Sequence, residues 1–322
     1  MRQCGFWQRL ARQATATHPP LGALVSTDGG QVHALSDRPA TREIEGEGLP
    51  VVLLHGASGN LRDFTLSLGP RLARRHRVIA MDRPGFGHSA PVAGAERLMV
   101  QVRRLRTALR RLGHRRVHLV GHSYGGALAL AWSLTHADDV ASLSLISAPT
   151  MDWGGALERF YSIAGHPVAG WALSQAVRFA PEARLGATLG EVFAPAPVPA
   201  RYRAEAGIEL ALRPRTFRLN ARQVRALHGE IRALEPRHGE IRCPVAILHG
   251  TEDRIVEAKT HAVPLAARLH DASLTLIDGA GHMPHHSHTG RVVAAVEDAI
   301  ARAGRLSPAI PRPRTDRSRT AG

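Results

Sequence analysis

The stretch RVHLVGHSYGGALALAWSL, residues 116–134, predicts how this chain folds. It begins as a short apolar run typical of a buried strand and ends as an apolar helical segment. Between the two lies GHSYG, residues 121–125, a G-x-S-x-G pattern. The pattern alone is weak evidence, but between a strand and a helix it is typical of a sharp turn that exposes a serine hydroxyl. Gly121 and Gly125 lack the Cβ atoms that would collide in such a turn, so we expect Ser123 to be an exposed nucleophile on a strained backbone.

Short apolar runs alternate with helical patterns on both sides of this turn, as expected for a parallel sheet covered on both faces. GALVS and QVHALS flank Asp28-Gly29 and predict an antiparallel hairpin at the start of the fold. The sequence therefore predicts an α/β fold with a mostly parallel sheet of eight strands and helices on both faces. The other strands are expected at 51–54, 77–81, 116–120, 142–146, 245–248 and 274–277, and the helices at about 61–75, 96–112, 124–136, 257–269 and 289–303.

One connection is far longer than a crossover helix requires. Almost a hundred residues separate SLSLI from VAIL, and they contain several helical patterns. We expect a helical cap at residues 150–240, inserted after strand 6 into a core of residues 21–149 and 241–303. Residues 1–20 are expected to be a flexible segment, and residues 304–322 a disordered basic tail.

Two later loops supply the groups that a serine nucleophile needs, a base and a carboxylate that orients it. LHGTEDRIV places Asp253 after the run VAIL, and LIDGAGHMPHH places His282 after LTLI. Parallel strands deliver their C-terminal loops to one edge of the sheet, so both side chains can meet Ser123 there. Glu252 is the alternative acid, and Asp278 is expected to be a turn residue at the end of its strand.

Four blocks in a fixed order carry a resemblance to a known family: HGASGN, DRPGFGHS, GHSYGG, and GTED with GAGH. Over about residues 25–303 the chain resembles the α/β-hydrolase superfamily, in its capped serine hydrolase, carboxylesterase-like branch. The resemblance implies an oxyanion hole made by the backbone amides of Ala57 and Tyr124. Epoxide hydrolases and haloalkane dehalogenases resemble the chain in their cap but carry an aspartate where Ser123 stands, which argues against both activities. Supporting roles are expected for the neighbours of these groups: His55, Gly56, Gly121, His122 and Gly125.

Two residues of DRPGFGHS are expected to act structurally. Asp82 should tie down the turn after its strand. Arg83 is interpreted as a solvated arginine or a brace for the loop, with contact to a substrate carboxylate as the alternative.

The net charge of +15 is concentrated in three windows, residues 1–20, 101–118 and 302–322. Two are the ends of the chain, and the third has the apolar spacing of an amphipathic helix with its arginines in solvent. No nucleic-acid-binding motif accompanies the charge, so we expect no nucleic-acid partner. No run of residues is apolar enough to span a bilayer, and the start MRQCGFWQRLARQ is interrupted by polar residues. A cytoplasmic protein is expected, with a short N-terminal surface anchor as an alternative.

Metal ions and other cofactors are not expected. The two cysteines, Cys4 and Cys243, lie too far apart in sequence to suggest a zinc site or a structural disulfide. The group His282, His285, His286 and His288 resembles a metal site by count alone, and His282 is already assigned as the base. His285 and His286 are expected to line or support their loop.

Aromatic residues are concentrated in the cap, which holds eight of the chain's fourteen. If they face the sheet, they form an apolar roof over Ser123 that suits an acyl or aromatic group. The alternative is that they form only the core of the cap itself. The residues expected to line a substrate pocket are Trp153, Phe160, Tyr161 and Trp171.

The sequence as a whole favours a hydrolase of small, fairly apolar carboxylic esters that works through an acyl-enzyme. A carbon–carbon bond hydrolase is the leading alternative, and lactonase or thioesterase activity on the same three residues is also open. A ligand-binding protein that keeps the fold without turnover is the non-enzymatic alternative. The expected partner is a small-molecule acyl substrate, and the sequence does not predict an oligomeric state.

Overall fold

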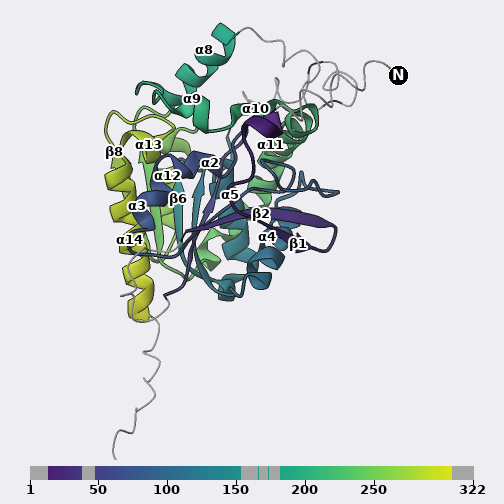
Figure 1. Cartoon of the computed structure of the whole chain (residues 1–322). Coiled ribbons are helices and arrows are strands. Elements are labelled where there is room, and N and C mark those ends of the chain that lie inside the picture. The colour runs from purple at the N-terminus through teal and green to yellow at the C-terminus, as the bar shows by residue number, and fades with distance from the viewer. Residues whose placement is uncertain (1–13, 38–47, 154–165, 167–172, 174–181, 307–322) are drawn as a thin grey trace, which may run out of the picture.

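The protein is built on one sheet of eight strands (Figure 1). The structure, a computed structural model, describes residues 14–37, 48–153, 166, 173 and 182–306. The strand order is β1-β2-β4-β3-β5-β6-β7-β8, and only the pairings β1–β2 and β2–β4 are antiparallel. The predicted mostly parallel eight-stranded sheet is therefore confirmed. The strands are β1 (Ala23–Thr27), β2 (Gly30–Asp37), β3 (Val51–Leu54), β4 (Val78–Met81), β5 (Val117–His122), β6 (Val140–Ile146), β7 (Val245–Gly250) and β8 (Ala272–Ile277).

Helices cover both faces of the sheet (Figure 1). On one face lie α4 (Leu98–Arg111), α5 (Tyr124–Thr135) and α12 (Ala258–Arg268), and on the other lie α3 (Leu68–Leu72) and α14 (Thr289–Leu306). The shorter elements of the core are α2 (Arg62–Thr65), η1 (Ala137–Asp139) and α13 (Pro284–Ser287).

Side chains of the central strands alternate between two apolar cores, one on each face. In β3, Val52 and Leu54 belong to the core beneath α4 and α5, whereas Val51 and Leu53 belong to the core beneath α3 and α14. All four side chains are fully buried. Successive residues of a strand point to opposite faces, so a strand covered on both sides is apolar along most of its length. Burial on both faces explains the uninterrupted runs such as VVLL.

The helical insertion after β6 is present as predicted, and its described part extends from residue 182 to β7. It contains α8 (Glu182–Phe193), α9 (Tyr202–Glu205), α10 (Ile208–Leu212), α11 (Pro214–Leu234) and η3 (Glu235–Glu240). Figure 1 shows α8 to α11 at the same end of the sheet, above α2 and α5. The predicted helical patterns in residues 154–165 and 168–180 lie almost entirely outside the described residues. We call the described part, residues 182–240, the cap.

Two segments differ from the sequence prediction. The helix expected at 61–75 is divided into α2 and α3. Pro70 has no amide hydrogen and its ring conflicts with the carbonyl four residues earlier, so one continuous helix is disfavoured there. Within the expected flexible segment, residues 14–17 form a helical turn and His18 is buried, so packing begins before residue 20.

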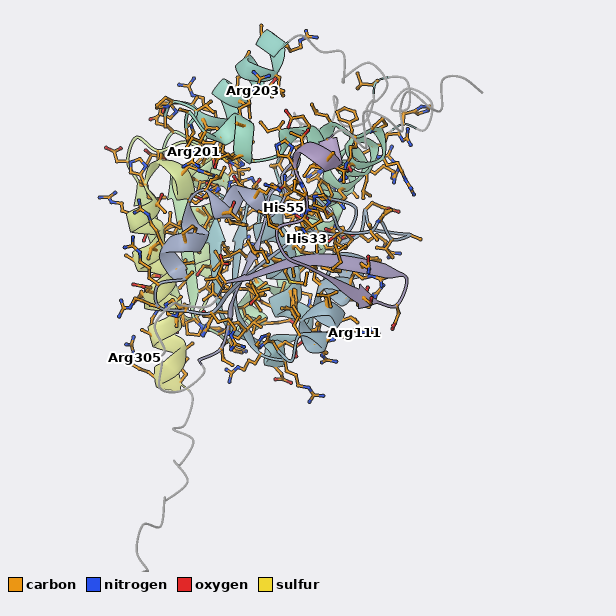
Figure 2. The ribbon with its side chains drawn as sticks, in the orientation of Figure 1. His33, His55, Arg111, Arg201, Arg203 and Arg305 are labelled. Carbon is orange, nitrogen blue, oxygen red and sulfur yellow. The ribbon has the colours of Figure 1, made fainter. Side chains whose placement is uncertain are left out.

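Arginines lie on the outer side of α4, as the amphipathic pattern predicts. Val102 and Leu105 are fully buried, whereas Arg103 and Arg110 are exposed. Figure 2 shows Arg111, Arg201, Arg203 and Arg305 at the periphery, with His55 in the interior. Within the described part of the chain, no helix combines the length and apolar character needed to cross a bilayer.

Candidate active site

Three side chains from three different strand ends meet at the carboxyl edge of the sheet. Ser123 follows β5, Asp253 follows β7 and His282 follows β8. The Ser123 hydroxyl donates to Nε2 of His282 over 3.1 Å, and Nδ1 of His282 donates to Oδ2 of Asp253 over 2.8 Å. The predicted trio is thus joined in one hydrogen-bonded chain. Glu252, the alternative acid, is exposed and is not part of it.

Ser123 sits on a strained turn between β5 and α5. Its φ of 52° and ψ of −121° fall in a region that non-glycine residues seldom occupy, and holding such a conformation costs of the order of 1–3 kcal/mol. Glycines on either side make the turn sterically feasible. A Cβ on Gly121 would lie 2.3 Å from the Gly125 carbonyl oxygen, and one on Gly125 would lie 2.0 Å from the Leu54 carbonyl oxygen.

Replacing Gly125 with alanine is expected to lower the free energy of unfolding by about 3 kcal/mol, because the new methyl group meets rigid backbone of the sheet. Gly229→Ala is the matched control, since Gly229 lies in α11 with open space around it. That variant should be as stable as the parent or slightly more so. Urea unfolding of both variants tests the expectation, which fails if Gly125→Ala unfolds at the parent's urea midpoint.

Asp253 is held as a buried carboxylate that faces His282. Its Oδ1 accepts the backbone amides of Ile255 at 3.0 Å and Val256 at 2.9 Å. His249, at the end of β7, places Nε2 3.3 Å from Oδ2 of Asp253 and donates to the Val256 carbonyl. Burial alone would raise the pKa of Asp253, but hydrogen bonds from His249 and His282 outweigh it and hold the pKa far below its ordinary value. The carboxylate is therefore ionised whenever the fold is intact near neutral pH.

The amides of Ala57 and Tyr124 lie in the loop after β3 and at the first residue of α5. Among the described residues, no carbonyl accepts a hydrogen bond from either amide. The Tyr124 side chain is turned into the core, where its hydroxyl accepts a bond from Gln101. Tyr124 can therefore contribute only its backbone amide to the site, as its predicted role in the oxyanion hole requires.

Arg83 braces the loop of Ala57 from inside the protein. Its guanidinium donates to the carbonyl oxygens of His55, over 3.1 Å, and Gly56, over 3.0 Å. The guanidinium carbon also lies 4.2 Å from the ring centre of Tyr124. The side chain is fully buried, and burial lowers its pKa to about 10, so it stays charged at neutral pH. Because the side chain is fully buried and four of its five N–H groups donate inside the protein, Arg83 matches the brace rather than a solvated arginine or a contact to substrate.

His55 and Asp82 complete the support of this loop. Nδ1 of His55 donates to the Gly56 carbonyl over 2.9 Å, and Nε2 accepts the Arg83 amide over 3.0 Å. Burial lowers the pKa of His55 to about 4, which keeps the ring neutral and able to accept. Asp82 accepts the amides of Leu61 and His88, so its carboxylate ties two loops together.

A buried carboxylate, Asp63 in α2, supports the loop that carries His282. Its Oδ2 accepts from Nε2 of His285 over 2.9 Å, and its Oδ1 accepts from Nε2 of His286 over 2.8 Å. The hydroxyl of Tyr202, in α9, donates to Oδ1 over 2.9 Å. The two histidines hold the pKa of Asp63 well below its ordinary value despite its burial. Asp63 thus joins the core, the histidine loop and the cap, and His285 and His286 support their loop as expected.

Asp63, His122 and His285 are also the described residues whose spacing best matches a metal site, with ligand atoms within 4.8 Å of one another. Nε2 of His285 donates to Asp63 and Nε2 of His122 donates to the His282 carbonyl over 2.9 Å, whereas Nδ1 of His285 has no hydrogen-bond partner among the described residues. A metal ion bound through these Nε2 atoms would have to replace both hydrogen bonds. The group is therefore arranged as a hydrogen-bonded cluster behind His282.

The aromatic residues of the insertion after β6 have separate positions. Phe193 and Tyr202 are buried together with Met283, next to His282, and their ring centres are 4.7 Å apart. Trp153 packs instead against the core and the rings of His228 and His261. Among the described residues, the ring and core contacts of Trp153 include none with Ser123, Asp253 or His282. Three expected pocket residues lie outside the described residues: Phe160, Tyr161 and Trp171.

Several supporting residues were not found from the sequence. His249 lies in LHGTED, four residues before Asp253. This closeness in sequence is the only feature that could have indicated its contact with Asp253. Asp63, Asn220 and Gln223 carry no local signal, because each acts on residues more than a hundred positions away.

Comparisons with known proteins identify the family and the fold. The sequence profile of the alpha/beta hydrolase fold matches residues 50–289. The 2-hydroxy-6-oxo-6-phenylhexa-2,4-dienoate hydrolase of Burkholderia cepacia is 27% identical over 252 residues, which cover 76% of this chain and 84% of that protein. A shorter match, 40% identical over 107 residues, is to the dihydrolipoyllysine-residue acetyltransferase component of the acetoin cleaving system of Pseudomonas putida. It covers 33% of this chain and 29% of that protein.

Solved structures show the same fold. An esterase from Exiguobacterium antarcticum superposes with a TM-score of 0.70 at 18% sequence identity, and the match covers 87% of this chain and all of that one. Since the family profile spans well over half of the sequence, the chain belongs to the alpha/beta hydrolase fold family.

Proposed function

We propose that the protein is a serine hydrolase that cleaves small, fairly apolar carboxylic esters through an acyl-enzyme intermediate. The observation that carries the proposal is the unbroken chain of hydrogen bonds from Ser123 through His282 to Asp253. A serine hydroxyl is a weak nucleophile by itself, and a neutral imidazole held by a buried carboxylate is the arrangement that activates it.

Each residue has a role that its contacts support. His282 accepts the proton of Ser123 through Nε2 as the hydroxyl oxygen attacks the ester carbonyl, and Asp253 stabilises the imidazolium that forms. The amides of Ala57 and Tyr124 donate to the oxyanion, and a donor of this kind contributes about 3 kcal/mol to transition-state stabilisation. His282 then protonates the departing alcohol. Water, activated by the same ring, releases the acid and restores Ser123.

Hydrolysis of a carbon–carbon bond is the second candidate, because the Burkholderia cepacia relative is named for a dienoate that contains a ketone and no ester. Such a substrate carries a carboxylate, which calls for a cation in the pocket. Among the described residues, Arg83 braces the oxyanion loop, and four of its five N–H groups donate to His55, Gly56, Gln101 and Gln223. That commitment favours an uncharged acyl substrate.

A hydrolysis screen separates the two candidates. We expect turnover of p-nitrophenyl esters from acetate to decanoate, with medium chains preferred if an apolar roof covers Ser123. Thioester, lactone and 2-hydroxy-6-oxo-6-phenylhexa-2,4-dienoate substrates are measured beside them. Activity confined to the dienoate would replace the esterase proposal with the carbon–carbon hydrolase. A fluorophosphonate probe that fails to label Ser123, together with tight binding of a ligand, would favour a binding protein.

A further inference from the structure

The inner side of α11 is fastened to the loops at the carboxyl edge of the sheet by polar side chains. Thr216 donates to the Gly85 carbonyl over 3.2 Å, Asn220 bonds to Ser58, and Glu230 accepts the Leu98 amide over 2.7 Å. These residues recur at spacings that bring them to one face of the helix. Figure 1 places α11 in the cap at that end of the sheet. The helix is therefore attached to the loops themselves as well as packed on the apolar core.

The contact between Asn220 and Ser58 is double. Oδ1 of Asn220 accepts the Ser58 amide over 2.8 Å, and Nδ2 donates to the Ser58 hydroxyl over 3.0 Å. The two bonds fix which end of the Asn220 amide faces which atom, and the side chain is only 5% exposed. Ser58 has a φ of 54°, in the left-handed region that a serine seldom adopts. Asn220 thus holds a disfavoured backbone conformation in place.

Ser58 directly follows Ala57, so two peptide groups determine where the Ala57 amide points. The first, between Gly56 and Ala57, is held by its carbonyl oxygen, which accepts bonds from Arg83 and His55. In a trans peptide the carbonyl and the amide hydrogen point in opposite directions, so these bonds aim the Ala57 amide away from Arg83. The second, between Ala57 and Ser58, is held by Asn220.

The core and the cap each fix one of these peptide groups. Arg83 itself is linked to α11, because its guanidinium donates to Oε1 of Gln223. Gln223 is completely buried and also donates to the Ala95 carbonyl over 2.8 Å. The two peptide groups beside Ala57 are therefore both held through α11, one directly by Asn220 and the other by Arg83, which bonds to Gln223.

We infer that Asn220 is a positioning residue of the active site, which holds the Ala57 amide in line with the oxyanion through Ser58. The inference rests on the proposed function, since it assigns the Ala57 amide to the oxyanion hole. The cap then contributes to the chemical step as well as to substrate binding. When Asn220 is lost, Ser58 can leave its left-handed conformation and the Ala57 amide turns with it.

The test is steady-state kinetics of Asn220→Ala on p-nitrophenyl acetate and p-nitrophenyl octanoate. We expect kcat to fall roughly 10- to 100-fold, as for partial loss of one oxyanion donor, with KM changed less than about twofold. The loss should be the same for both esters, because the oxyanion is common to them. A change in KM alone, or a loss confined to octanoate, would make Asn220 a pocket residue and overturn the inference.

A second variant tests the route through Ser58. Glycine adopts positive φ without penalty, so Ser58→Gly in the Asn220→Ala protein should recover at least about threefold in kcat. No recovery would contradict the inference. Asn220→Leu, which keeps the branched shape and the number of non-hydrogen atoms, is used if the alanine variant does not fold. Arg225→Ala is the matched control, since Arg225 is exposed on the same helix.

Labelling by a fluorophosphonate separates this inference from the proposed function. Wild-type protein that labels at Ser123, with Asn220→Ala labelling roughly 10-fold more slowly, supports both. Wild-type and variant labelling at the same rate would overturn the inference and leave the proposed function standing. Wild-type protein that neither labels nor hydrolyses any ester would overturn both.

Discussion

Ser123→Ala is expected to lower kcat for ester hydrolysis by at least about four orders of magnitude while the protein stays folded. The substitution removes the atom that attacks the carbonyl and forms the acyl-enzyme, and nothing adjacent replaces it. Binding energy and the oxyanion amides remain, so a small residual rate above the uncatalysed reaction is expected. Steady-state hydrolysis of p-nitrophenyl butyrate measures the loss, and circular dichroism checks the fold.

The matched control is Ser26→Ala, because Ser26 is an exposed serine of β1 at the opposite edge of the sheet from β8. It should keep full activity and full fluorophosphonate labelling, whereas Ser123→Ala should not label. Turnover that persists in Ser123→Ala at a tenth of the parent rate or more would show that another group attacks the ester.

A cooperative loss of stability between about pH 6.5 and pH 4 is the second large effect we expect. Ten of the chain's 19 histidines are buried in the described part of the chain. Burial lowers the pKa of four of them, His55, His118, His238 and His261, to about 4 each. The unfolded chain, whose histidines titrate near 6.5, therefore binds protons in this range that the folded protein does not.

The sign follows from this difference in protons. Stability is fully present above the unfolded pKa and falls as the pH drops towards the folded pKa, by up to roughly 3 kcal/mol for each such ring. Since a domain is stable by only about 5–15 kcal/mol, a few of these rings suffice to unfold it. Asp63 and Asp253, whose pKa values lie below the ordinary carboxylate value, add a further loss only as the pH falls below about 4.

His238→Phe tests the histidine account. His238 is fully buried, and neither ring nitrogen has a hydrogen-bond partner within the described residues. The variant should show a shallower decline of unfolding free energy between pH 6.5 and pH 4, measured by urea unfolding at half-unit steps. His270→Phe is the control, because His270 is exposed. Equal slopes in parent and His238→Phe would refute the assignment of this proton uptake to His238.

The sheet and the positions of its strands along the chain were accessible from the sequence because a strand buried on both faces is mostly apolar. Runs such as VVLL, SLSLI and VAIL are typical of strands in a parallel sheet that helices cover on both faces. The turn at Ser123 was accessible for a steric reason, since its glycines stand where a Cβ would strike backbone. The apolar periodicity of residues 61–75 predicts one helix, and it does not register Pro70, which disfavours a continuous helix there.

The trio of Ser123, Asp253 and His282 was predictable because each residue follows an apolar run, and parallel strands bring such positions together. The partners that hold the trio and its loops were not. Asn220 meets Ser58 across 162 positions, and His286 meets Asp63 across 223. Such contacts depend on how the cap and the loops fold back on the sheet, and no local pattern of residues encodes them.

The insertion that contains the cap leaves the sheet at the end of β6 and returns at the start of β7, and these two strands are hydrogen-bonded neighbours. Because the two strands are parallel, its two ends lie at opposite edges of the sheet, and α11 and η3 carry the chain back alongside α5. Evolution can exchange or lengthen most of this segment to admit new acyl groups without rebuilding the catalytic edge. The exception is α11, because its side chains form hydrogen bonds with the loops at that edge. A foreign cap grafted onto this sheet would therefore need to retain that helix.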